Sequence, residues 1–231
     1  MLAKYLWLAF LAMQGASAGM YRLADGMSST TNPNGVWQFG FSATASLASD
    51  QFRLAKYADT SEPVVIWHPA KSDGNGPGYY PYVALNQTPQ TRTTSANGWA
   101  LRSGAVAMEA ANDGAYSIIR FVAPTSGDYT VKAQFAGIHY RLSSTDVHVL
   151  HNEAHLFDGE IAGYGGDPMF HPVEGAHPVA SWSGTVRLSP GDTISFAVGY
   201  GSNRTHYNDT TELIAEVQRM TGTPASTKRG K

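Results

Sequence analysis

The sequence predicts an all-β fold, either a β-sandwich or a β-barrel, on three observations. Polar and apolar residues alternate with a period of two over much of the chain, which is the pattern of half-buried strands. Short runs of this kind are separated by turns rich in Gly, Pro, Asn and Asp. No stretch of three helical turns stands out between them. Many short strands at short spacing are typical of sandwiches and barrels.

The clearest strand is Asp128–His139, where every second residue from Tyr129 to Phe135 is apolar and the residues between are mostly polar. The turn Pro124–Gly127 precedes it. The stretches Ser72–Gly78 and Gln87–Gly98 are expected to be loops. The expected strands in chain order are Val36–Phe41, Phe52–Tyr57, Val64–Trp67, Tyr80–Leu85, Tyr116–Val122, Asp128–His139, Thr145–Leu150, His155–Ile161, Thr185–Leu188, Thr193–Val198 and Glu212–Val217.

Residues 1–18 are expected to form a secretory signal peptide. Lys4 gives a charged start, Tyr5–Met13 is an apolar run, and Ala16–Ala18 is a small-x-small cleavage site. Cleavage would leave a mature chain beginning at Gly19, located outside the cytoplasm in the periplasm or the extracellular medium. The apolar run is too short to cross about 30 Å of hydrocarbon, and no later segment is longer, so we expect no membrane insertion.

Composition and charge narrow the class of partner. The 231 residues include no cysteine, so burial rather than disulfides must hold the exported fold together. Residues 19–218 hold eleven Lys and Arg against eighteen Asp and Glu, which argues against a nucleic-acid partner. We expect the β-sandwich over residues 19–219 and a disordered, basic tail over 220–231, because that tail is poor in apolar residues.

Several segments, in order, resemble one family. They include "TDVHVL" at the start of Thr145–Asn152 and "GD-x-I-x-F-x-VG-x-G-x-N-x-x-Y-x-D-T-T-x-L" within Pro190–Leu213, together with Asn32–Gly40, Tyr116–Gly137 and Leu156–Ile161. The chain resembles the secreted bacterial β-sandwich domain often found in PEP-CTERM-type exported proteins. The resemblance covers nearly all of the mature chain. It implies a single antiparallel β-sandwich, jelly-roll-like and similar to carbohydrate-binding modules, and it bears on fold and location rather than activity. The chain departs from the family in lacking the anchor of a sorting tail, which favours release or a periplasmic location.

Four aromatic residues are candidates for ligand binding. Trp67, Tyr79, Tyr80 and Tyr82 flank the expected loop Ser72–Gly78. A sugar ring presents an apolar C–H face that stacks on an aromatic ring, so aromatic residues near loops can form a platform for a glycan. Packing in the core is the alternative for this group. Trp37 and Trp182 fall within alternating patterns and are expected in the core.

An oxygen-rich loop is a candidate calcium site. Asn203, Asn208 and Asp209 lie close together before the last expected strand, with Asp209 the strongest single ligand. The resemblance implies that similar jelly rolls often hold a structural Ca²⁺ near this place. The alternative is a turn without a metal, because Asn and Asp also occupy turns for local backbone reasons.

Catalytic signatures are weak. No G-x-S-x-G motif and no cysteine occurs. Asp158 and Glu160 would share one face of a strand at a spacing that glycosidases use, although surface strands often carry such pairs as solvated charge.

Histidines are the remaining candidates for metal binding. A single zinc site from His148, His151 and His155 is geometrically poor, because His148 and His151 should point to opposite faces. His151 and His155 flank a turn and could approach each other, and a two-histidine site with His171 or His177 is an alternative. The sequence favours a polar hairpin tip without a metal over these sites.

The sequence therefore favours a secreted, non-catalytic binding or adhesive module for a glycan or cell-surface polymer, stabilised by calcium. One alternative is a structural, self-associating protein of the envelope or matrix. A second is a glycan-cleaving hydrolase that uses Asp158 and Glu160. The sequence does not fix the oligomeric state.

Overall fold

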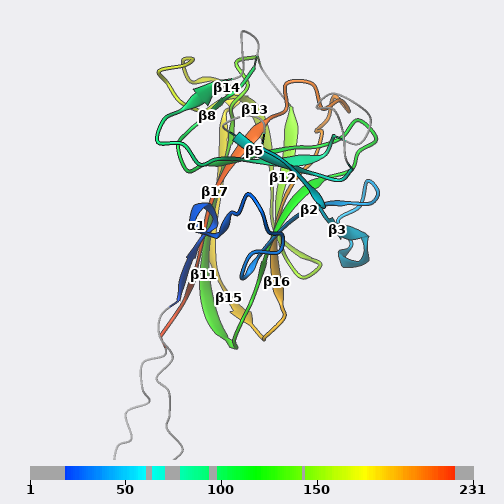
Figure 1. Cartoon of the computed structure of the whole chain (residues 1–231), viewed down its shortest axis with the longest axis vertical. Helices are drawn as coiled ribbons and strands as arrows, with labels where there is room; N and C mark the ends of the chain where they lie inside the picture. The colour runs from blue at the N-terminus through cyan, green and yellow to red at the C-terminus, as the bar shows by residue number, and fades with distance from the viewer. Residues whose placement is uncertain (1–18, 61–63, 71–78, 94–97, 142–143, 222–231) are drawn as a thin grey trace, which may run out of the picture.

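The structure is a computed structural model that describes residues 19–60, 64–70, 79–93, 98–141 and 144–221. In this part of the chain, two large antiparallel sheets pack face to face around an apolar core (Figure 1). The predicted antiparallel β-sandwich is confirmed. The expected signal peptide, residues 222–231 of the expected tail and the whole Ser72–Gly78 loop lie outside the described residues.

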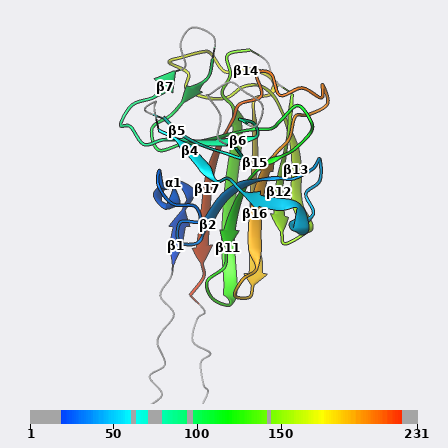
Figure 2. The ribbon, with the colours of Figure 1, turned by 45° about the vertical axis from the view of Figure 1, so that its right-hand side comes forward.

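The first sheet has eight strands within the described residues, in the order β15-β11-β17-β9-β6-β5-β4, with β1 also pairing β17. The pairing of β1 with β17 sets the two described ends of the chain side by side (Figure 2). These strands are β1 (Met20–Arg22), β4 (Tyr57–Asp59), β5 (Val64–His68), β6 (Tyr82–Asn86), β9 (Val106–Glu109), β11 (Gly127–Gly137), β15 (Val179–Leu188) and β17 (Thr211–Arg219).

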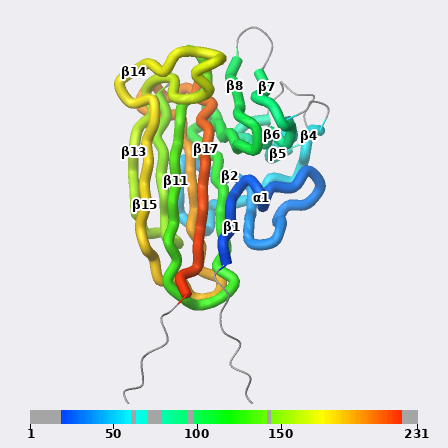
Figure 3. The backbone as a smooth tube through the Cα atoms, turned by 90° about the vertical axis from the view of Figure 1, so that its left-hand side faces the viewer, coloured from blue at the N-terminus to red at the C-terminus, as the bar shows by residue number. Residues whose placement is uncertain are grey.

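The second sheet has seven described strands in the order β14-β13-β12-β16-β10-β2-β3. They are β2 (Trp37–Ser42), β3 (Phe52–Leu54), β10 (Ser117–Val122), β12 (Thr145–His151), β13 (Ala154–Tyr164), β14 (Glu174–His177) and β16 (Thr193–Val198). A separate ribbon pairs β7 (Arg92–Thr93) with β8 (Ala100–Leu101), and it lies at the same end of the molecule as β14 (Figure 3). The helices found among the described residues are α1 (Leu23–Gly26) and the short 3₁₀ helix η1 (Ser49–Gln51). Within the described residues, no helix is long and apolar enough to cross a membrane.

The main core lies between the sheets and is rich in aromatic rings. The Trp37 ring packs edge-on against Phe121, with ring centroids 5.5 Å apart, and lies near Phe196. Trp37 is buried and Trp182 packs partly buried against the core, as the alternating patterns predict. The inward positions of β11 are buried as well, because the side chains of a strand alternate between its two faces.

A second, smaller core lies on the opposite face of β5, β6 and β9. Tyr79, Tyr82, Leu101 and Ile138 are among its buried members, and the half-buried Trp99 packs against it. The segment around β8 therefore covers this part of the first sheet and leaves β6 and β9 buried on both faces. This second core supports the floor of the candidate site.

Two expectations about strands are wrong. Phe52–Tyr57 is not one strand: β3 pairs with β2 in the second sheet, whereas β4 pairs with β5 in the first. The chain changes sheets at Ala55, which is buried and donates its N–H to the carbonyl of Phe39. The expected loop Gln87–Gly98 contains β7.

Candidate functional site

A cleft of about 250 Å³ opens beside the second core, where β6 and β9 meet the segment that joins β16 to β17. The residues before β8 form part of its wall, which places it at the end of the molecule where β8 lies (Figure 3). The lining residues are Tyr80, Tyr82, Gly98, Trp99, Glu109, His139, His206, Tyr207, Asn208 and Thr210.

Aromatic rings follow one another along the wall of the cleft. The His206 ring lies between Tyr80 and Tyr207, with ring centroids 4.2 Å and 4.7 Å away. The Tyr207 side chain is the exposed end of this series, with 66% of its surface accessible. Burial, and then the negative charge of Glu109, raises the pKa of Tyr80 to about 12. The Tyr80 phenol therefore stays protonated and can donate a hydrogen bond at neutral pH.

A buried carboxylate lies beside these rings. Glu109 Oε2 accepts hydrogen bonds from the Tyr82 hydroxyl at 2.6 Å and from Thr210 Oγ1 at 2.5 Å. His206 Nδ1 lies 3.3 Å from Glu109 Oε1. Two neutral donors fix one oxygen of Glu109, so the polar floor of the cleft is oriented before any ligand arrives.

Only two of the four residues of the expected aromatic platform lie in the cleft. Trp67 is buried in the main core, and its indole N–H donates to the carbonyl of Ser28 at 2.7 Å. Tyr79 is buried in the second core, 5.4 Å from Tyr80 and 5.7 Å from Tyr82 between ring centroids. Of the four aromatic residues, Tyr80 and Tyr82 line the cleft, and only Tyr80 is partly exposed.

Sequence reasoning missed Trp99, Tyr207, Glu109 and His206. A signal for Tyr207 was present: it is an aromatic residue within the polar run from Asn203 to Asp209, where no strand face would bury it. Glu109 carried no such signal, because β9 is buried along its whole length and shows no alternation.

The three residues expected to bind calcium differ in their surroundings. Asn203 is exposed, and its side-chain oxygen accepts the N–H of Thr205 at 3.0 Å, which is a local turn. Asn208 borders the cleft with a left-handed backbone, φ 69°. Asp209 is fully buried, and neither of its carboxylate oxygens makes a well-formed hydrogen bond.

The buried Asp209 carboxyl is the feature that fits a cation. Burial, and then the negative charge of Glu109, raises its pKa to about 8, while the nearby amide of Ser144 partly opposes the rise. A buried carboxylate without hydrogen bonds is costly, and a hard cation would satisfy both of its oxygens. Asp209, the residue expected to be the strongest calcium ligand, is therefore the candidate with two unsatisfied buried oxygens, which either a retained proton or a cation can satisfy.

The expected histidine contacts are partly wrong. His151 and His155 contact different carboxylates: His151 pairs across the hairpin with Ala154 and its Nε2 lies 3.6 Å from Asp192, whereas His155 Nδ1 lies 2.6 Å from Asp158. His171 Nε2 instead lies 2.7 Å from Glu174. Neither histidine joins His148 and His155, which meet on the outer face of the β12–β13 hairpin with ring centroids 5.6 Å apart.

Asp158 and Glu160 share a face of β13, opposite His148 and Asp146. Burial raises the pKa of Asp158, but hydrogen bonds from His148 and His155 outweigh it and hold the pKa below its usual value. A glycosidase acid needs a raised pKa, so Asp158 is not suited to that role.

No protein-family model and no curated protein matches the chain. Among solved structures, a CBM51 from Clostridium perfringens GH95, in complex with methyl-galactose, is 11% identical with a TM-score of 0.36, covering 86% of this chain and 99% of that one. A family 35 carbohydrate binding module from Clostridium thermocellum is 11% identical with a TM-score of 0.28, covering 72% and 98%. A beta-glucosidase from Kluyveromyces marxianus is 18% identical with a TM-score of 0.29, and the match covers 48% of this chain but only 12% of that enzyme. Such low values say nothing about ligands, so we take the function from the geometry of this chain.

Proposed function

We propose that the chain is an exported, non-catalytic binding module and that its cleft binds a sugar unit of a glycan. The observation that carries this proposal is the meeting of aromatic rings and fixed polar groups in one cleft. Tyr80, Trp99 and Tyr207 line it together with Glu109 and His206. Ligand sites combine aromatic walls with a few well-placed polar groups. A sugar ring needs both, because its C–H face stacks on rings and its hydroxyls require donors and acceptors.

The arrangement favours binding over cleavage. Hydrolysis of a glycoside requires an acid that can reach the ligand. Asp209 has a raised pKa, but it is fully buried and is not among the residues that line the cleft. Glu109 has one oxygen held by Tyr82 and Thr210, which suits a fixed hydrogen-bond acceptor.

Removing the exposed ring should weaken glycan binding without unfolding the protein. We expect Tyr207→Ala to lower the affinity at least about tenfold, equivalent to 1.4 kcal/mol, because the sugar loses its stacking surface. The ligand is first found with a glycan array, and affinities are then measured by titration calorimetry.

The matched control for this experiment is Tyr57→Ala. Tyr57 is a tyrosine with 41% of its surface exposed, and it lies on β4 outside the cleft. This variant should bind like the wild type, and both variants should keep the wild-type melting temperature within a few degrees. Failure of the wild type to bind any glycan, or equal affinities for Tyr207→Ala and Tyr57→Ala, would contradict the proposal.

Export should leave a mature chain that begins at Gly19. The pairing of Met20 with Gln218, and the hydrogen bond from the Arg219 N–H to the Gly19 carbonyl at 2.8 Å, support this position. Cleavage before Gly19 keeps both contacts, whereas cleavage two or three residues later would remove β1 residues. N-terminal sequencing of exported protein tests the position, and a sequence that starts at Met1 would overturn the proposed location.

Calcium would stabilise the module through Asp209. The ion would supply the counter-charge that the buried carboxylate lacks, next to the loop that carries Tyr207 and Asn208. The order of this loop, and with it the cleft wall, would then depend on the ion.

A further inference from the structure

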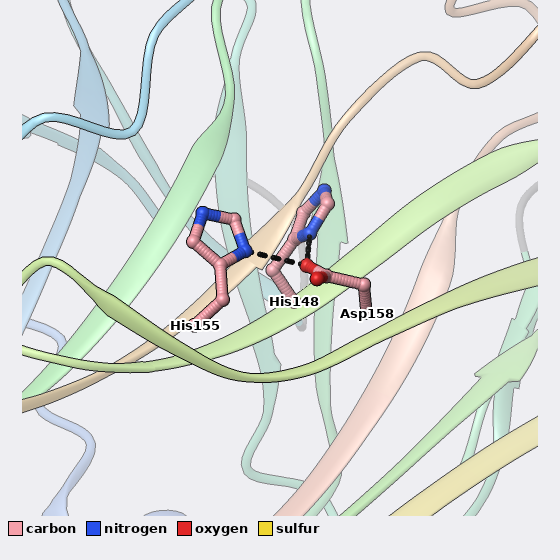
Figure 4. A group of neighbouring side chains, drawn as sticks. All are labelled: His148, His155 and Asp158. Carbon is pink, nitrogen blue, oxygen red and sulfur yellow. Dashed lines mark hydrogen bonds and ion pairs between the residues drawn. The ribbon is translucent and has the colours of Figure 1, made fainter.

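We propose that the outer face of the β12–β13 hairpin carries a divalent transition-metal site, with Zn²⁺ as its occupant, formed by His148, His155 and Asp158. One ligand atom from each residue lies within 4.8 Å of the others. Figure 4 shows both imidazole rings directed at the Asp158 carboxylate. The site is separate from the cleft, none of whose lining residues it shares.

A β-bulge brings the three side chains together. His148 faces Asp158 across the hairpin, and a regular ladder would then place Leu150 opposite Leu156. Leu150 instead faces His155, because the register shifts after Val149 and β13 carries an extra residue. The extra residue reverses the alternation of side chains, so His155 and Asp158 share a face although they are three positions apart.

The ligand atoms already converge. His148 Nδ1 lies 2.5 Å and His155 Nδ1 lies 2.6 Å from the same oxygen, Asp158 Oδ1. The two rings stand edge to face with an interplanar angle of 83°, so both nitrogens can point at one centre without a clash between the rings. Without a metal, each of these contacts is a hydrogen bond whose proton lies between the ring nitrogen and the carboxylate oxygen. A cation can take the place of these protons after a small outward movement of the exposed Asp158 and His155.

Asp146 orients the His148 ring through the ring nitrogen that does not face Asp158. The second ring nitrogen, His148 Nε2, lies 2.8 Å from Asp146 Oδ2, and Asp146 Oδ1 accepts the N–H of Gly201 at 2.7 Å. With Nε2–H donating to Asp146, His148 Nδ1 presents its lone pair to the metal. Histidine ligands of zinc are commonly held by a carboxylate in this way.

The support of Asp146 is built into the fold. A Cβ atom added at Gly199 would lie 2.3 Å from Asp146 Oδ1, so a larger residue there would displace the Asp146 carboxylate from its present position. The Tyr116 ring stands edge-on to His148 with centroids 5.7 Å apart. The most buried ligand is therefore fixed on several sides, and the other two are reachable from solvent.

The donor set selects the metal. Two imidazole nitrogens and one carboxylate oxygen suit Zn²⁺, which takes His and Asp ligands in a tetrahedron and can keep a water at the fourth position. Ca²⁺ prefers a shell of six or more oxygens and would bind poorly here. The site therefore differs in chemistry from the calcium site proposed at Asp209.

Zinc binding to the full exported chain tests the proposal. Titration calorimetry of metal-free protein should give one Zn²⁺ per chain, and His155→Gln should lower the affinity at least about tenfold. Asp146→Asn should lower it about 10- to 100-fold, because Asp146 positions His148. The matched control is His171→Gln, which removes another histidine paired with a carboxylate three residues away and should leave zinc binding unchanged.

Two readouts separate ligation from structure. The imidazole resonances of His148 and His155 should shift on addition of Zn²⁺, while those of His171 should not. Melting temperatures in chelator should be similar for the wild type and His155→Gln, because His155 is exposed. No zinc binding by the wild type, or equal loss of affinity in His155→Gln and His171→Gln, would overturn the site. Should Asp146→Asn fail to fold, His155→Gln still decides the question.

Discussion

Asp209→Asn should stabilise the metal-free protein at pH 8 and destabilise the calcium-loaded protein. In the absence of metal, the substitution removes a buried carboxyl whose ionisation the fold opposes. In calcium, the same substitution replaces an anionic ligand by a neutral one of similar size and weakens ion binding. A reversal of sign between the two conditions is therefore the signature of a calcium ligand at this position.

The pH dependence of the metal-free protein follows from the same carboxyl. The pKa of Asp209 is raised from its ordinary value of 3.8 to about 8 in the folded state, by burial and then by the charge of Glu109. Between these values the folded state keeps a proton that the unfolded state has lost. The contribution of Asp209 to stability is thus complete below about pH 4 and falls by about 1.4 kcal/mol per unit as the pH rises to 8. The total effect of several kcal/mol is absent in Asp209→Asn.

Thermal melts of the wild type and Asp209→Asn, across this pH range in chelator and in excess calcium, measure both effects. Calcium at one hundred times its dissociation constant should stabilise the wild type by about 2.7 kcal/mol. Asp192→Asn is the control, because hydrogen bonds from Ser189 and Asn152 lower the pKa of Asp192 and its pH dependence has the opposite sign. Identical wild-type melts in calcium and in chelator would exclude Asp209 as a calcium ligand.

Arg102→Met should destabilise the protein by about 3–5 kcal/mol, because it leaves a buried carboxylate without its partner. Glu212 on β17 has 1% of its side-chain surface exposed. Arg102 donates to Glu212 Oε1 from Nε at 2.8 Å and also from Nη2. Arg102 follows β8 directly, so this ion pair ties the segment of Trp99 to the first sheet. The variant should therefore also weaken glycan binding in the cleft.

Removing the charge of the other partner, Glu212, should lower the free energy of unfolding by less. In Glu212→Gln the remaining charge is that of Arg102, whose side chain is 35% exposed and can be solvated. The double variant Arg102→Met/Glu212→Leu should regain most of the loss, because replacing both partners by apolar groups removes the unpaired charge. Urea unfolding of the three variants gives the free energies. A cost below about 1 kcal/mol for Arg102→Met would show that the pair behaves as a surface salt bridge.

The alternation of polar and apolar residues was enough to predict an all-β fold and the long strand β11, whereas the choice of a sandwich over a barrel came from the family resemblance. In β11 every inward position from Tyr129 to Phe135 is buried, because a strand with one solvated face records its burial directly in the sequence. Strand β9 was not predicted from the sequence, for the opposite reason. The second core buries both of its faces, so its residues do not alternate.

The candidate site residues also fall into two groups, those that local sequence identifies and those whose surroundings depend on distant segments. The sequence by itself was enough to recognise the polar loop Asn203–Asp209 and the group of aromatic residues around Tyr80, because the composition of a loop is a local property of the chain. Only the tertiary structure decided that Trp67 and Tyr79 are buried, because the segments that cover them lie far away in the sequence. It alone also set His155 beside Asp158, because a bulge depends on how two strands pair and a single strand does not record its partner's register.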